Sequence, residues 1–233
     1  MPIVLVTGAS QGLGAAIAEA FAAEPEGRLA LVSRNAERLR AVAEACRAKG
    51  ATADVFLCDV TDEAAVARMA ADVTARFGVP DVLVVNAGAF TPGSIFETTP
   101  ATFRAQLDAN LTSAFLTTHA FLGAMAARGS GHLFYMASVA SLRGYAGGAA
   151  YCAAKHGLLG LARVVREETK AHGLRVTALM PGATRTPSWD GTTEPDERFM
   201  PPEDVAAMVV AAWKLSGRSV VEELLMRPQL GDL

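Results

Sequence analysis

The sequence is poor in the residues that build metal centres and disulfide frameworks. Its 233 residues include only three cysteines and four histidines. Cys46, Cys58 and Cys152 have no metal-like spacing and cannot all pair, so we expect them to be small, reduced core residues of a cytosolic protein. The histidines are scattered and form no His-x-x-x-His pair. No metal site is expected.

The chain also lacks a basic excess and any long apolar run. The formal net charge is −3, which gives no electrostatic footprint for nucleic acid. The apolar start at residues 3–6 is far too short for a secretory core or a membrane span, and charged or turn residues interrupt every later run. We therefore expect a cytoplasmic protein with no signal peptide and with neither nucleic acid nor membrane as a partner.

The composition that is present favours a fully packed α/β protein. Hydrophobic residues make up 51% of the chain and charged residues 19%, a balance that suits a sheet buried on both faces. The length suits one domain over residues 1–233. Apolar, β-branched segments predict strands at 3–6, 29–33, 53–58, 81–85, 132–137, 174–180 and 219–226, with helices at 15–23, 36–49, 63–77, 100–127, 149–171 and 201–215. Such alternation predicts a doubly wound parallel sheet (Rossmann fold) of about seven strands with helices on both faces.

Glycines cluster directly after the first expected strand. The segment from Thr7 to Gly14 reads TGASQGLG and leads into a helix. Glycine allows a tight turn and close backbone approach, and a helix N-terminus offers unpaired N–H groups to a phosphate. A glycine-rich loop can also be only a turn, but its position after the first strand favours a nucleotide cradle.

The end of the second expected strand bears on the choice of cofactor. An acidic residue there would bind the ribose 2′-hydroxyl of NAD, whereas an arginine accommodates the 2′-phosphate of NADP. The acid is absent and Ser33 is followed by Arg34, so NADP(H) is favoured over NAD(H). The alternative is that Arg34 is a solvated residue that opens the next helix.

Three residues near the middle of the chain suggest proton-transfer chemistry. Tyr151 and Lys155 are four residues apart in an expected helix, so they share one face. A nearby ammonium group favours the phenolate and is expected to lower the pKa of the phenol. Ser138 ends a buried strand and can meet that face. Tyr-x-x-x-Lys is common by chance, so the pattern gains weight only from the rest of the chain. Asn110 lies within an expected helix, where asparagine is unfavourable, and indicates a kink or a buried polar role.

In this order, the motifs resemble those of the short-chain dehydrogenase/reductase family. They are TGASQGLG, Asp59-Val60, Asn86-Ala87-Gly88, Asn110, Ser138, Tyr151-x-x-x-Lys155 and Pro181-Gly182, and they span residues 3 to about 215. The resemblance implies catalytic roles for four residues. Tyr151 would be the general acid or base, Lys155 would lower the phenol's pKa and bind the nicotinamide ribose, Ser138 would orient the substrate carbonyl, and Asn110 would hold a water in a proton relay.

The resemblance also implies a binding site for the dinucleotide. The glycine loop would hold the pyrophosphate, the second strand's end the adenosine ribose, the pair after the third strand the adenine, and the segment after the sixth strand the nicotinamide. The residues concerned are Gly8, Ser10, Gln11, Gly12, Leu13, Gly14, Ser33, Arg34, Asp59, Val60, Asn86, Ala87, Gly88, Tyr151, Lys155, Pro181, Gly182, Thr184 and Thr186. NADP-dependent members often carry a basic residue where this chain has Gln11, a departure that weakens the NADP prediction without reversing it.

The expected activity is reduction of a ketone or aldehyde, or oxidation of the alcohol, on a small molecule. The C-terminal segment lacks the Val-x-Gly-Gly tail of 3-oxoacyl-carrier reductases, so that substrate class is an alternative. The same scaffold would also suit an isomerase, epimerase or dehydratase, or a non-catalytic dinucleotide-binding regulator. The substrate pocket is expected to draw on Phe90, Leu142, Tyr145, Ala183 and Trp189, under a mobile loop at about 185–200. The resemblance further implies a homodimer or homotetramer.

Overall fold

One parallel sheet runs through the centre of the protein. The computed structural model describes residues 2–233. Its seven strands lie in the order β3-β2-β1-β4-β5-β6-β7, and every neighbouring pair is parallel. They are β1 (Ile3–Thr7), β2 (Arg28–Ser33), β3 (Thr52–Leu57), β4 (Val82–Val85), β5 (Gly131–Met136), β6 (Leu174–Pro181) and β7 (Glu223–Met226). The predicted doubly wound sheet is confirmed.

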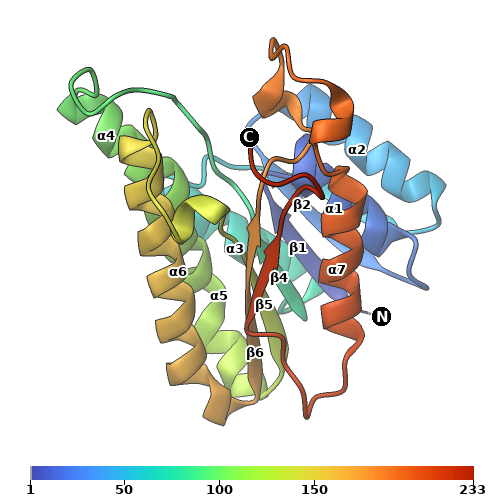
Figure 1. Cartoon of the computed structure of the whole chain (residues 1–233). Helices are drawn as coiled ribbons and strands as arrows, with labels where there is room; N and C mark the ends of the chain where they lie inside the picture. Colours follow the sequence, from blue (N-terminus) through green and yellow to red (C-terminus); the bar gives the residue numbers. More distant parts are fainter. Residues whose placement is uncertain (1) are drawn as a thin grey trace.

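Helices cover both faces of this sheet (Figure 1). One layer contains α1 (Gly12–Ala22), α2 (Ala36–Ala48) and α7 (Pro202–Lys214). The other contains α3 (Glu63–Phe77), α4 (Pro100–Leu107), α5 (Ser113–Arg128) and α6 (Ala149–Thr169). No helix within residues 2–233 is both long and apolar enough to cross a bilayer.

The burial of the central strands on both faces explains the continuous apolar segments in the sequence. Successive side chains of a strand point to opposite faces, so a strand covered on both sides must be apolar throughout. In β1, Ile3 and Leu5 pack under the layer of α3, α5 and α6, whereas Val4 and Val6 pack under α1, α2 and α7. The whole of β1 is buried.

Two elements differ from the sequence-based boundaries. The helix expected over residues 100–127 is divided into α4 and α5 by a π-helical turn, Asp108–Thr112, which contains Asn110. A π turn shifts the hydrogen-bond register by one residue and often accompanies a functional site. The last strand is also shorter than expected, because only Glu223–Met226 pairs with β6.

The strand order reverses direction beside β1. The chain passes from β1 outward to β2 and β3, and then returns to β4 on the other side of β1. In open α/β sheets, ligands bind in the crevice at the carboxyl ends of the strands, where the order reverses. The glycine loop follows β1 and Asn86 follows β4, so both lie at this crevice.

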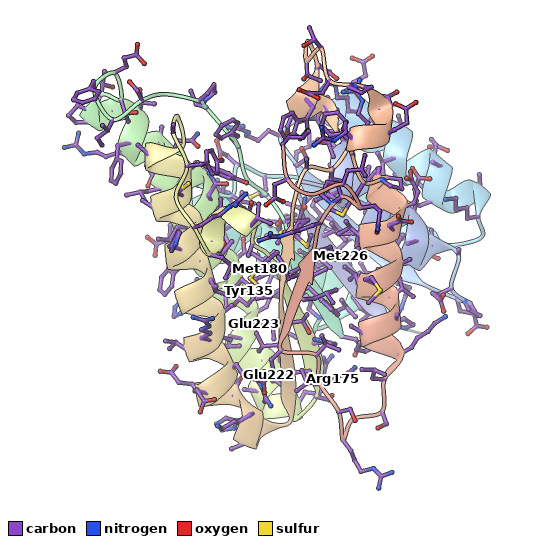
Figure 2. The ribbon with its side chains drawn as sticks, in the orientation of Figure 1. Tyr135, Arg175, Met180, Glu222, Glu223 and Met226 are labelled. Atoms are coloured by element: carbon purple, nitrogen blue, oxygen red, sulfur yellow. The ribbon has the colours of Figure 1, made fainter. Side chains whose placement is uncertain are left out.

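The edge strand β7 brings the C-terminal segment back to the same crevice. Arg163 of α6 pairs with Glu223 at 2.7 Å and Arg166 pairs with Glu222 at 3.1 Å; both glutamates are labelled in Figure 2. At the other end of β7, the Gly182 N–H donates to the Met226 carbonyl at 2.8 Å. The C-terminus then lies between the two helical layers, at the upper end of the sheet in Figure 1.

Candidate active site

The carboxyl ends of the strands enclose a cavity of about 400 Å³. The structure brings most of the predicted site residues together in its lining: Gly8, Gln11, Gly12, Leu13, Gly14, Asn86, Ala87, Gly88, Asn110, Ser138, Tyr151, Lys155, Pro181, Gly182, Thr184 and Thr186. Ser10, Ser33, Arg34, Asp59 and Val60 lie outside this lining. Of the expected pocket residues, Phe90, Tyr145, Ala183 and Trp189 line the cavity and Leu142 does not.

The glycine loop leaves no room for side chains where a phosphate would approach the backbone. Gly8 and Gly12 have φ values of +67° and +56°, in the left-handed region that favours glycine. A Cβ on Gly14 would lie 2.3 Å from the Gly8 carbonyl oxygen and 2.6 Å from Asn86 Nδ2. The Asn86 amide in turn donates to the Thr7 carbonyl at 2.9 Å and ties the end of β4 to the loop. The residues present therefore fit a dinucleotide, whose pyrophosphate the start of α1 would hold.

Tyr151 and Lys155 lie on one face of α6, with Ser138 opposite them at the end of β5. Lys155 Nζ lies 5.6 Å from the centroid of the Tyr151 ring and donates to the Met136 carbonyl at 2.8 Å. The Ser138 hydroxyl accepts from the Ala140 N–H at 3.1 Å, and it lies close enough to the Tyr151 phenol to stabilise the phenolate. Because this contact uses only the oxygen of Ser138, the hydroxyl proton can be donated either to Tyr151 or to a substrate oxygen in the cavity.

Burial controls the protonation of the phenol and of the amine. It raises the pKa of Tyr151 above its usual range, and the nearby Ser138 hydroxyl offsets part of this shift. Burial also lowers the pKa of Lys155 to about 8. The expectation of a lowered phenol pKa is therefore wrong for this structure, because loss of water around the phenolate dominates. At neutral pH Tyr151 is a phenol, the form that donates a proton.

Asn110 is a buried structural link at the π turn. Its Nδ2 donates to the Ala89 carbonyl at 2.8 Å and to the Gln106 carbonyl at 3.0 Å, and its Oδ1 accepts from the Ala89 N–H at 3.3 Å. The side chain is 1% exposed. The expected buried polar role is confirmed: Asn110 fixes the loop after β4 against α4. The water-holding role stays a prediction.

The predicted adenosine region lies beside the cavity, around the end of β2. Ser33 Oγ donates to Ser10 Oγ at 2.9 Å and so joins this strand end to the glycine loop. Arg34 pairs with Asp59 at 3.4 Å, and the Arg34 side chain is 74% exposed. Hydrogen bonds from Thr61 and the nearby Arg34 hold the pKa of the Asp59 carboxyl below its usual range.

Sequence reasoning missed several residues of the cavity wall, of which the most consequential lie at the C-terminus. Asp232 and Leu233 line the cavity together with Arg143. Asp232 Oδ2 accepts from Arg143 at 2.5 Å, while its Oδ1 is buried without a hydrogen-bond partner among residues 2–233. Nothing in the sequence around Asp232 indicates that this acidic residue lines a pocket.

The expected mobile loop contains short ordered turns. Pro187–Trp189 and Asp196–Arg198 form 3₁₀ turns, and the Trp189 and Phe199 rings pack edge to face at 5.0 Å. Arg185 pairs with Asp196 at 2.9 Å across the segment. The mobility of this loop over the pocket stays a prediction.

Together, the sheet order and the cavity define a Rossmann-type α/β protein with a glycine-rich loop after β1 and a Ser-Tyr-Lys cluster. A profile described as short chain dehydrogenase matches residues 2–197. The chain is 37% identical to a sepiapterin reductase of Chlorobaculum tepidum, over 99% of this chain and 98% of that one. The protein belongs to the short-chain dehydrogenase family, a family of oxidoreductases.

Solved structures agree with this assignment over the whole length. An alcohol dehydrogenase of Thermococcus sibiricus complexed with 5-hydroxy-NADP has a TM-score of 0.91 and 31% identity, with 98% of this chain and 97% of that one covered. An actinorhodin polyketide ketoreductase with NADPH also has a TM-score of 0.91, at 29% identity, with 100% and 98% covered.

Proposed function

We propose that this protein is an NADP(H)-dependent oxidoreductase that reduces a ketone or aldehyde, or oxidises the corresponding alcohol. The observation that carries the proposal is the convergence of Ser138, Tyr151 and Lys155 on one cavity with the glycine loop. Bound NADPH would supply the hydride. The chain's own residues must then orient the carbonyl and deliver the proton.

In the reducing direction, Tyr151 is the proton donor. Its raised pKa keeps the phenol protonated at neutral pH, and the Phe90 ring packs edge to face against it at 5.0 Å, which limits its movement. Ser138 polarises the carbonyl by donating its hydroxyl proton, which the Ala140 contact leaves available. The hydrogen bonds that Tyr151 and Ser138 donate to the carbonyl oxygen strengthen as negative charge develops on that oxygen. They therefore stabilise the transition state more than the ground state.

Lys155 replaces the proton that Tyr151 gives up. With a pKa of about 8, the buried amine carries a proton at neutral pH and can release it at small cost. Its bond to the Met136 carbonyl fixes Nζ beside the Tyr151 ring. Asn110 acts as a positioning residue, because its bonds to Ala89 hold the loop after β4. The proposal includes a water held by Asn110 as part of the proton relay.

For the cofactor, the absence of an acid after β2 and the presence of Arg34 favour NADP(H) over NAD(H). The NADP and NADPH complexes among the similar structures support the same choice. Gly8, Gly12 and Gly14 would hold the pyrophosphate, with Pro181, Gly182, Thr184 and Thr186 at the nicotinamide end.

One of the similar structures suggests a second substrate class. The similar actinorhodin enzyme is a polyketide ketoreductase, which makes a 3-oxoacyl thioester an alternative substrate for this chain. A free small carbonyl compound is the preferred class, in line with the sepiapterin reductase to which the chain is 37% identical.

We also propose a homodimer or homotetramer formed through α5 and α6. Phe115 on α5 is 50% exposed and Val164 on α6 is 53% exposed, so both helices offer apolar side chains that a second copy would bury. Light scattering coupled to size-exclusion chromatography should give two or four chains; a single chain would overturn this assembly.

A substrate screen tests the function directly. Purified protein is mixed with NADPH and, in parallel, with NADH, and a panel of ketones, aldehydes and 3-oxoacyl thioesters is followed by the loss of reduced-cofactor absorbance. NADPH-dependent turnover of a free carbonyl that Tyr151→Phe lacks supports the proposal. Tight NADPH binding with no turnover across the panel would favour the non-catalytic regulator.

A further inference from the structure

The structure places a second arginine next to the glycine loop, at a position the sequence motifs do not include. Arg38 lies in the first turn of α2, and its Nη1 donates a hydrogen bond to Gln11 Oε1. Gln11 is the N-cap residue of α1 and lines the cavity. The two residues are 27 positions apart in sequence, so only the fold brings them together.

Local contacts hold the start of α2, and with it Arg38, beside the glycine loop. Asn35 caps α2, with its side chain accepting from the Arg38 N–H at 3.0 Å. The Ser33 hydroxyl also accepts from the Asn35 N–H at 3.4 Å and donates to Ser10. These contacts join the end of β2, the start of α2 and the glycine loop. The bond to Gln11 then brings the exposed Arg38 guanidinium beside a residue of the cavity wall.

The charge of Arg38 is less compensated than that of Arg34. Arg34 pairs with the carboxylate of Asp59, which must be displaced or shared when another anion binds. Arg38 instead bonds to the neutral amide of Gln11, which does not offset its positive charge. A guanidinium has five N–H donors, and one bond to Gln11 leaves donors for a phosphate.

We propose that Arg38, held by Gln11, is a specificity-determining residue for the 2′-phosphate of NADP. The inference rests on the proposed NADP(H) dependence. Family members that prefer NADP often carry a basic residue at the position of Gln11; here the cation reaches the same place from α2, and the glutamine orients it. An arginine is suited to this task because it binds phosphate oxygens through paired, charge-assisted hydrogen bonds.

The test measures binding to the protein without turnover. Isothermal titration with adenosine 2′,5′-bisphosphate and with adenosine 5′-phosphate compares two ligands that differ only in the 2′-phosphate. Arg38→Gln should weaken the bisphosphate about tenfold or more and the monophosphate less than about twofold, the loss expected for one charge-assisted contact. The matched control is Arg40→Gln, an exposed arginine about 200° around the same helix, which should change neither affinity.

A rescue variant separates the role of charge from that of local structure. Adding Gln11→Lys to Arg38→Gln returns a cation to the glycine loop and should restore most of the affinity for the bisphosphate. An unchanged preference for the bisphosphate in Arg38→Gln would overturn the inference, and so would an equal loss for both ligands.

The same titrations distinguish this failure from failure of the proposed function. If the wild-type protein prefers the bisphosphate and Arg38→Gln keeps that preference, the NADP proposal stands and the role of Arg38 falls. If the wild-type protein binds neither ligand, or binds both equally, the NADP proposal falls and the role of Arg38 falls with it.

Discussion

His132 should make the protein lose stability in acid, and its replacement by glutamine should remove that loss. The side chain is fully buried in β5 and stacks on Phe134 at 3.9 Å. Its Nε2 lies 2.7 Å from the Thr177 hydroxyl, which already donates to the Val221 carbonyl at 2.6 Å. Nε2 must therefore carry the hydrogen, and Nδ1 is a buried acceptor with no partner in the part of the chain that the structure describes.

Protonating Nδ1 would place an unpaired charge inside the sheet. Burial, with a smaller contribution from the nearby Arg175, lowers the pKa of His132 from 6.5 to about 3. The folded-state pKa is depressed, so this contribution to stability is complete above the unfolded pKa and is lost as the pH falls toward the folded value. The whole shift corresponds to roughly 5 kcal/mol, and the part lost between about pH 7 and about pH 5 to roughly 2 kcal/mol.

Urea denaturation at these two pH values, at one protein concentration, measures the effect. Glutamine can keep the donor to Thr177 but does not titrate, so His132→Gln should lose about 2 kcal/mol less than wild type on acidification. Carboxylates that titrate in the same range affect both proteins and cancel. His172→Gln removes an exposed histidine and should behave as wild type. Equal losses in wild type and His132→Gln would refute the reasoning.

Two further predictions concern the site. Gly14→Ala should abolish cofactor binding and destabilise the fold by about 1–3 kcal/mol, because the new Cβ meets the Gly8 carbonyl. For comparison, Gly123→Ala in α5 places a Cβ where no described atom lies within 4 Å. This change should stabilise the fold by about 0.5–1 kcal/mol. Calorimetry measures the stability of each variant and fluorescence titration its cofactor binding. Intact cofactor binding in Gly14→Ala would contradict the role of the glycine loop in holding the cofactor. Because the pKa of Tyr151 is raised, alcohol oxidation should accelerate as the pH rises toward the alkaline range, while carbonyl reduction stays level near neutrality. Initial rates in both directions measure this, and a flat profile for oxidation would argue against Tyr151 as the base.

The sequence was sufficient for features that depend on local pattern. Continuous apolar segments identified the buried strands because each strand is covered on both faces, as Val4 and Leu5 show. The spacing of Tyr151 and Lys155 placed them together because a helix repeats every 3.6 residues. The glycines of the loop were found because each meets a steric requirement of its own.

Features that depend on distant contacts or on burial were not predictable. The pKa of Tyr151 moves upward because the folded protein excludes water from the phenol, a property that no spacing reveals. Asp232 enters the cavity only because β7 directs the tail back across the crevice. Likewise, Arg38 reaches Gln11 from another helix. For Asn110, the sequence indicated a kink or a buried polar role, but not that the break would be a π turn whose asparagine bonds to the loop after β4.

The most direct test of the central claim is a paired measurement on Tyr151→Phe. This change removes only the hydroxyl and keeps the ring that packs against Phe90. We predict that the variant binds NADPH as tightly as wild type and loses carbonyl turnover by a factor of about 100 to 10,000, the usual contribution of a positioned general acid. Turnover within about a factor of ten of wild type, with cofactor binding intact, would show that Tyr151 is not the proton donor.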